Sequence, residues 1–148
     1  MQKKAGQLLE RAISIAVEAH RGQKDRNGAP YILHPLRMMC RVDTETEKIV
    51  AVLHDVVEDT DWTFKDLKRE GFGDQILKAL DCLTKREAEN YGDFVRRSAS
   101  DDLARRVKIA DLEDNMDVRR LRVVSEKDRE RLGKYLRAWR QLTRKDGG

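Results

Sequence analysis

The segment KIVAVLHDVVED, at residues 48–59, constrains the fold of this chain more than any other. Its apolar side chains follow one another so closely that a helix carrying them must be buried, since a helix surrounded by water has no need of them. Yet one histidine and three carboxylates interrupt the segment, at His54, Asp55, Glu58 and Asp59. An unpaired carboxylate is costly to bury. The segment therefore predicts a buried helix whose charges are offset by basic partners or by a metal ion.

Helical signals recur along the rest of the chain. Thr44 and Glu47 form a predicted capping box before this segment, and Ser100 and Ser125 are expected N-caps further on. No segment alternates apolar and polar residues between hairpin turns, as paired strands would. We therefore expect an all-α fold of seven or eight helices. They are expected at residues 3–21, 34–42, 44–60, 63–71, 74–84, 91–99, 101–116 and 125–142.

Length and composition favour one highly soluble domain, because the chain has 148 residues, of which 39% are apolar and 39% charged. We expect the domain to span residues 1–148, with a motif-bearing core at about 8–120 and a basic amphipathic helix at about 125–142. No segment comes near the roughly 18 apolar residues of a membrane span, and no signal-type apolar core follows the basic N-terminus. A cytoplasmic protein is expected, with Cys40 and Cys82 as buried free thiols.

Positive charge is concentrated at the C-terminal end. Residues 118–148 hold 11 Lys and Arg against 4 Asp and Glu, a net charge of +7, which leaves −3 of the total of +4 for residues 1–117. A basic helix there can contact nucleic acid or another anion. We favour a solvent-exposed face instead, because no nucleic-acid-binding motif accompanies the charge. An apolar stripe also lies on the opposite face, at Leu132, Tyr135, Leu136 and Trp139.

The polar residues of the buried segment lie on neighbouring strips of one helix surface. Glu58 follows His54 by one helical turn, and Asp59 follows Asp55 in the same way. An imidazole and a carboxylate can bind a divalent metal together, which leaves two carboxylates nearby for proton transfer. Because two ligands do not complete a coordination shell, other segments are expected to contribute.

Two further residues can complete such a metal centre. His34 stands beside Pro35 in the segment YILHP, and Asp111 is an acid inside the apolar helical segment VKIADLEDNM, where it needs a partner. With His54 and Asp55 they form a set of two imidazoles and two carboxylates, which suits Mn²⁺, Fe²⁺ or Zn²⁺. A network of buried ion pairs is the better interpretation of each acid taken singly. The combined set favours the metal.

Three segments resemble the motif blocks of the HD-domain phosphohydrolases. They are AHRGQKDRNGAPYILHP at 19–35, AVLHDVVEDTDWT at 51–63 and VKIADLEDNM at 107–116. Within that superfamily the chain is most similar to the RelA/SpoT-type guanosine tetraphosphate (alarmone) hydrolases and their small stand-alone relatives. The resemblance keeps the order of the blocks and extends from residue 8 to about residue 120, so the last helix lies outside it.

The resemblance implies a metal-dependent hydrolase with a specific set of catalytic residues. One Mn²⁺ ion, or alternatively Fe²⁺ or Zn²⁺, is implied at His34, His54, Asp55 and Asp111. Glu58 and Asp59 are implied to position and deprotonate the attacking water. The implied reaction removes the 3′-pyrophosphate from guanosine tetra- or pentaphosphate, a small phosphorylated nucleotide.

The resemblance also indicates where the nucleotide binds. Asn115 is implied to line the nucleotide pocket, and Arg26 and Lys108 are the candidates for holding phosphates. Three acids depart from the family pattern. Asp25 replaces one of two adjacent basic residues, and Glu113 and Asp114 stand where the family usually has an apolar residue and a histidine. These substitutions are expected to disfavour a polyphosphate, and they leave the substrate open.

Two alternatives follow from these departures. The chain can hydrolyse another nucleotide, such as a dinucleotide phosphate, or it can be an HD module that senses a nucleotide without turnover. Nucleic-acid binding through the basic helix ranks below both. An HD-type phosphodiesterase with two metals is not expected, because it needs more than the three histidines of this chain. The oligomeric state stays open.

Overall fold

The computed structural model describes residues 6–144, and within that range every regular element is helical. The all-α prediction is therefore confirmed. The elements are α1 (Gln7–Ala19), α2 (Leu33–Met39), α3 (Glu45–Leu53), α4 (Val56–Asp59), α5 (Phe64–Arg69), α6 (Asp74–Leu83), α7 (Tyr91–Ala99), α8 (Asp102–Asn115), a 3₁₀ turn η1 (Val118–Arg120) and α9 (Glu126–Thr143). Because α3 and α4 are the two parts of one predicted helix, the described residues contain the eight helices that were expected. Residues 3–5 of the first predicted helix lie outside them.

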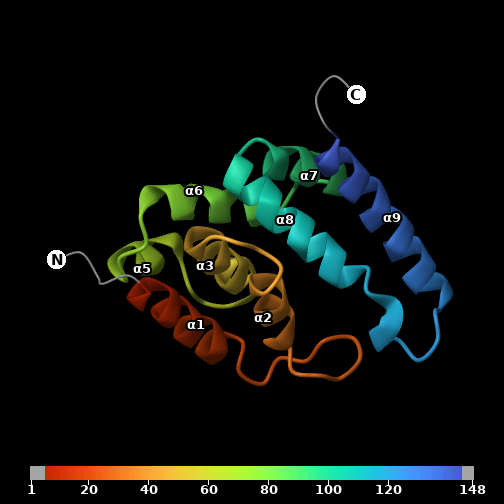
Figure 1. The fold of residues 1–148 in the computed structure, drawn as a ribbon, viewed down its shortest axis with the longest axis horizontal. Helices are drawn as coiled ribbons and strands as arrows, with labels where there is room; N and C mark the ends of the chain where they lie inside the picture. Colours follow the sequence, from red (N-terminus) through yellow and green to blue (C-terminus); the bar gives the residue numbers. More distant parts are fainter. Residues whose placement is uncertain (1–5, 145–148) are drawn as a thin grey trace.

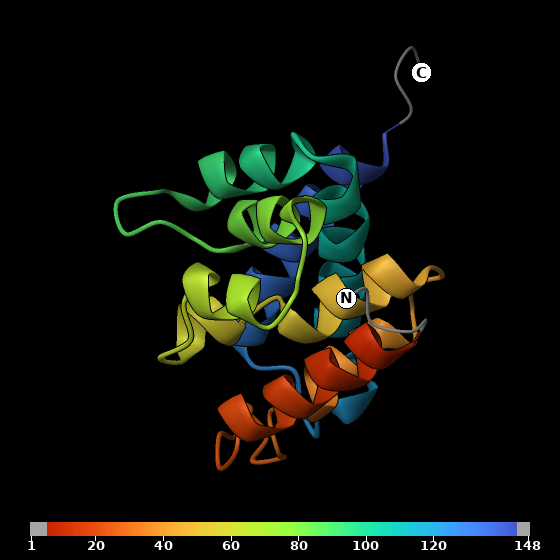
Figure 2. The ribbon, with the colours of Figure 1, turned by 90° about the vertical axis from the view of Figure 1, so that its left-hand side faces the viewer.

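Helix α3 forms the centre of the fold. It packs against α1 and α2 on one side and against α6 and α8 on the other, as Figures 1 and 2 show. Each of the residues from Ile49 to Leu53 is at most 2% exposed. Contact with helices on several sides explains why this segment is apolar all round rather than along a single stripe.

Helix α9 lies beside α8 at one edge of the molecule (Figure 1). The two helices and α7 share a second, smaller core, which contains Val95, Leu112, Ala138 and Leu142. Tyr135 and Trp139 pack against this core, as the predicted apolar stripe required, whereas Leu136 is 42% exposed. Burial of Tyr135 and Trp139 therefore helps to hold α9 against α7 and α8.

Helix ends follow side-chain caps in most of the expected places. The side chain of Thr44 accepts a hydrogen bond from the Glu47 backbone, but the predicted capping box is incomplete, because the Glu47 carboxylate accepts from the backbone of Asp43 instead. Ser125 forms a complete capping box at the start of α9. One predicted cap is wrong by a residue. Asp101, not Ser100, caps α8, because its carboxylate accepts from the backbone N–H of Ala104 at 2.9 Å, while Ser100 ends α7.

Two further expectations concern the membrane and the thiols. Among residues 6–144, no helix combines the length and apolar character that crossing a bilayer requires. Both cysteines are free, as expected. Cys82 is buried, but Cys40 is exposed, because it lies at the C-terminal end of α2 rather than on its packed face.

Candidate metal centre

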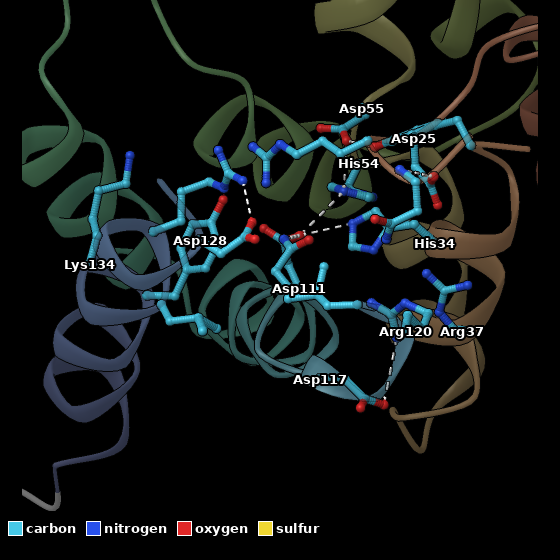
Figure 3. A pocket seen from close by; sticks show the side chains of 18 of the residues that line it. Asp25, His34, Arg37, His54, Asp55, Asp111, Asp117, Arg120, Asp128 and Lys134 are labelled. Atoms are coloured by element: carbon cyan, nitrogen blue, oxygen red, sulfur yellow. Dashed lines mark hydrogen bonds and ion pairs between the residues drawn. The ribbon is translucent and has the colours of Figure 1, made fainter. Parts of the chain in front are cut away.

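Three side chains from distant parts of the chain converge at the middle of the molecule. His34 comes from α2, His54 from the end of α3 and Asp111 from α8. Asp111 Oδ1 lies 3.0 Å from His34 Nε2 and 3.9 Å from His54 Nε2. All three side chains are buried, and Figure 3 shows them pointing toward one another.

The geometry of these three residues fits a divalent cation. One donor atom from each lies within 4.8 Å of the other two. Donors that each lie about 2.1 Å from one ion are separated by roughly 3–4 Å, so the observed spacing needs little adjustment. Two imidazoles and a carboxylate form a mixed nitrogen and oxygen donor set, which transition metals prefer. The predicted meeting of His34, His54 and Asp111 is therefore present.

A break in the predicted helix brings Asp55 to the edge of this centre. The helix ends at Leu53 and resumes at Val56, so His54 and Asp55 lie between α3 and α4. Asp55 Oδ2 is 3.0 Å from His54 Nε2 and accepts a hydrogen bond from the Tyr31 hydroxyl. Adjacent positions on a continuous helix diverge by about 100°. The break relieves that divergence and lets both side chains face the same space.

The imidazoles are oriented by hydrogen bonds on their other nitrogen. His54 Nδ1 lies 2.7 Å from the carbonyl oxygen of Ala51, which can only accept, so Nδ1 carries the proton. His34 Nδ1 lies 2.7 Å from Asp114 Oδ2. Histidine ligands of metals are commonly held in this way by a carbonyl or carboxylate. Both Nε2 atoms are thereby directed to the centre.

Without a cation, the centre is a network of opposite charges. Burial lowers the pKa of His34, but hydrogen bonds to Asp111 and Asp114 outweigh it and raise the pKa to about 9. Burial opposes ionisation of Asp111 as well, yet Lys108 and the histidines hold the pKa of Asp111 well below its usual range. Asp111 is therefore already ionised when a cation arrives, whereas the positively charged His34 must first lose a proton.

The two acids of α4 have different surroundings. The backbone N–H of Lys85 donates to Glu58 Oε1 at 2.7 Å, so Glu58 anchors the loop that follows α6. Within residues 6–144 no hydrogen bond engages the Asp59 carboxylate. Desolvation, Asp55 and Glu58 together raise the pKa of Asp59 to about 6. These three carboxylates lie within 4.8 Å of one another, which makes Asp59 the acid best suited to accept a proton.

The three predicted substrate-binding residues have different positions. Lys108 is buried, and its Nζ lies 2.9 Å from Asp111 Oδ2. Asn115 Nδ2 donates to Asp111 Oδ1 at 2.9 Å, and the residue is exposed. Arg26 is exposed in the loop before α2. All three line one cavity, but Lys108 and Asn115 already contact Asp111.

That cavity has a volume of about 1140 Å³ and lies between the metal centre and α9 (Figure 3). Arg131, Lys134 and Tyr135 of α9 form the wall opposite the histidines, together with Tyr91 of α7. Lys134 Nζ lies 4.1 Å from the centre of the Tyr91 ring. The sequence prediction left these residues out, because α9 is outside the motif blocks. The concentration of positive charge in this part of the chain was the only signal that the sequence analysis noted there.

Asp25 and Asp114, two of the departures from the family pattern, are located differently. Asp25 lines the cavity, but its Oδ1 accepts from the backbone N–H groups of Asn27 and Ala29 and so shapes the loop. Asp114 has no exposed surface and does not line the cavity. Arg37 Nε donates to Asp114 Oδ1 at 2.8 Å. The expected effect of Asp114 on a bound anion is therefore reduced by burial and by this ion pair.

Comparison with known proteins places these observations in context. The chain is 36% identical over 139 residues to the guanosine-3′,5′-bis(diphosphate) 3′-pyrophosphohydrolase of Aquifex aeolicus, a match covering 85% of this chain and 19% of that protein. It is 32% identical over 124 residues to the bifunctional (p)ppGpp synthase/hydrolase SpoT of Escherichia coli, covering 73% of this chain and 17% of that one. The chain thus spans less than a fifth of the length of these relatives. No family model matches it.

A solved structure confirms the fold. It belongs to a metazoan ortholog of SpoT that is described as hydrolysing ppGpp, and it superposes with a TM-score of 0.76 at 22% identity. The match covers 97% of this chain and 89% of the other. This chain therefore shares its helical fold with that structure. The chain is related over most of its length to a segment of the RelA/SpoT-type proteins, as its motifs predicted.

Proposed function

We propose that this protein is a metal-dependent hydrolase of phosphorylated nucleotides that removes the 3′-pyrophosphate from guanosine tetra- or pentaphosphate. The observation that carries the proposal is the convergence of His34, His54 and Asp111 beside Asp59. The names of the sequence relatives support the choice of substrate. Residues 6–144 act as one unit in this proposal, since the two sides of the cavity come from the motif-bearing core and from α9.

The proposed metal ligands are His34, His54, Asp55 and Asp111, with Mn²⁺ as the ion and Fe²⁺ or Zn²⁺ as alternatives. The donor spacing supports His34, His54 and Asp111 as ligands. The 3.0 Å contact between Asp55 and His54 supports Asp55. When bound, such an ion supplies Lewis acidity and positive charge next to the reacting phosphate.

Proton transfer is assigned to the acids of α4. Asp59 takes the proton of the attacking water, because its carboxylate is unengaged within residues 6–144 and its pKa of about 6 is close to neutral pH. Glu58, held by the Lys85 backbone, fixes the position of the water. This arrangement favours an enzyme over a sensor, since a protein that only binds a nucleotide gains nothing from an acid beside the reacting phosphate.

Phosphate binding is assigned to basic residues on both sides of the cavity. Arg26 faces the cavity from the loop before α2, and no ion pair engages it among residues 6–144. Arg131 and Lys134 face it from α9. Lys108 contributes mainly through Asp111, with which it pairs. Asn115 lies at the cavity surface, where its amide can contact the nucleotide while it donates to Asp111.

A second substrate class is supported by Asp25. This acid lines the cavity where the family usually has a basic residue, so a nucleotide with less charge at that end, such as a dinucleotide phosphate, is the alternative substrate.

The test is incubation of the Mn²⁺-loaded protein with guanosine tetraphosphate, guanosine pentaphosphate and nicotinamide dinucleotide phosphates. Pyrophosphate released from the guanosine compounds supports the first proposal, and orthophosphate released only from dinucleotides supports the second. Thermal stabilisation by a ligand without any product contradicts both and indicates a sensor.

A further inference from the structure

We propose that Asp114 is a positioning residue that orients His34 toward the metal, an inference that rests on the proposed function. The residue stands where the related hydrolases usually have histidine. The sequence offered no role for it beyond an unfavourable charge. The contacts of Asp114 in the structure indicate a role in positioning His34.

The contact between Asp114 and His34 is short and shielded from solvent. Asp114 Oδ2 lies 2.7 Å from His34 Nδ1, and the side chains are 0% and 9% exposed. The other nitrogen of the same ring, Nε2, lies 3.0 Å from Asp111 Oδ1. Because an ionised carboxylate only accepts hydrogen bonds, the contact with Asp114 keeps a proton on Nδ1, so a cation displaces the proton of Nε2 and binds that nitrogen.

Arginines on two other elements hold the Asp114 carboxylate in place. Arg37, one turn beyond His34 on α2, donates through Nε to Oδ1 at 2.8 Å and through Nη2 to Oδ2 at 3.1 Å. Arg120 of η1 donates to the Asp114 backbone oxygen at 2.7 Å and lies 3.4 Å from Oδ1. A buried carboxylate is costly unless it is paired and hydrogen-bonded. Burial raises the pKa of Asp114, but the hydrogen bonds with His34 and Arg37 outweigh it and lower the pKa to about 2.

The arrangement joins three elements at the metal ligand. His34 and Arg37 lie on α2, Asp114 on α8 and Arg120 on η1. A carboxylate that only balanced the arginines would not need to contact the imidazole. The bidentate pair with Arg37 leaves Oδ2 directed at His34 Nδ1, so the orientation of the ring follows from the orientation of the carboxylate.

The test compares Asp114→Asn with a matched control, Glu89→Gln, in the full chain. Glu89 forms a similarly shielded pair with Arg97 at 2.8 Å, but it lies outside the cavity. The Kd for Mn²⁺ is measured by competition with a chelator, and the absorption spectrum of the Co²⁺-loaded protein reports ligand geometry. We expect Asp114→Asn to weaken Mn²⁺ binding by about 10–100-fold and to change the Co²⁺ spectrum. Glu89→Gln should leave both unchanged, even if it lowers the melting temperature.

Wild-type affinity in Asp114→Asn with an unchanged Co²⁺ spectrum would overturn the inference while leaving the proposed function intact. If the wild-type protein itself binds no cation, the proposed function fails instead. Should Asp114→Asn not fold, nitrogen-15 NMR of the wild-type protein loaded with Zn²⁺ decides the question. A proton on His34 Nδ1, assigned with His34→Asn, supports the inference, and a proton on Nε2 overturns it.

Discussion

Lys108 Nζ lies 2.9 Å from Asp111 Oδ2, so the central acid of the metal centre has a cationic partner within the same helix. Lys108 is 7% exposed, and the pair is therefore shielded from water. Removing one partner of a buried pair leaves the other charge uncompensated. Lys108 thus helps to keep Asp111 ionised before a cation binds.

The first prediction concerns this pair. Lys108→Met should destabilise the metal-free protein by about 3 kcal/mol, because the Asp111 charge loses its partner in a buried site. Mn²⁺ should restore part of this loss, since the cation then compensates the same carboxylate. Thermal melts of the variant and the wild type, each with and without Mn²⁺, measure the effect. An equal loss of stability in both conditions would show that the lysine does not act through Asp111.

The second prediction concerns the proton acceptor. Asp59→Asn should reduce kcat by about 10²–10⁴-fold, because an amide cannot take the proton of the attacking water. The Kd for Mn²⁺ should change little, since Asp59 lies outside the three-residue centre. Glu89→Gln is the control. A variant that retains wild-type turnover would remove Asp59 from the mechanism.

The third prediction is a stability gain from the same substitution. Desolvation and the neighbouring acids raise the pKa of Asp59 to about 6, from 3.8 in the absence of these surroundings. The folded protein therefore binds more protons than the unfolded chain between these values, and the contribution of Asp59 to stability falls as pH rises through them. In the metal-free protein, Asp59→Asn should raise the melting temperature more at about pH 7.5 than at about pH 5. A gain that does not depend on pH would contradict the assigned cause.

The fourth prediction concerns protons released by the metal. His34 has a raised pKa of about 9, so at neutral pH its ring is positively charged and carries a second proton that a cation must displace. Mn²⁺ binding should release protons, and the apparent affinity should rise with pH up to about 9. Calorimetric titration in two buffers of different ionisation enthalpy detects the release. Identical heats in both buffers would show that His34 is already neutral.

The fifth prediction concerns the wall formed by α9. Lys134→Ala should raise KM for guanosine tetraphosphate by about 10-fold, the effect of losing one charge-assisted contact, with the Kd for Mn²⁺ unchanged. Arg137→Ala is the matched control, because Arg137 is exposed on the same helix and lies outside the cavity. Equal effects of the two variants would indicate a general effect of charge rather than a contact from the wall.

The sequence predicted the helical fold, because helix periodicity is a local signal. The meeting of His34, His54 and Asp111 was predicted from the need of buried acids for partners together with the resemblance of the three motif blocks to a known family. The sequence did not predict the break at His54 and Asp55. The flanking apolar residues continue without interruption, and the hydrogen bond from His54 Nδ1 to the Ala51 carbonyl appears only once the chain has folded.

Contacts over long sequence distances account for the other differences. Asp114 meets His34 across 80 positions of the chain, and nothing near either residue in the sequence specifies the pairing. The same holds for Lys134, which reaches the cavity only because α9 packs on α7 and α8. The need of a buried acid for partners, which led to Asp111, applied equally to Asp114. Applied to Asp114, that need would have indicated that this acid contacts basic residues or a histidine.

The dependence of pyrophosphate release on Mn²⁺ tests the central claim most directly. Metal-free protein is titrated with Mn²⁺ in the presence of guanosine tetraphosphate, and the product is measured at each step. The account predicts no release without the cation, and a rate that rises until one Mn²⁺ is bound per chain. The same rate in the presence and absence of a chelator, or in an Asp55→Ala variant, would contradict it.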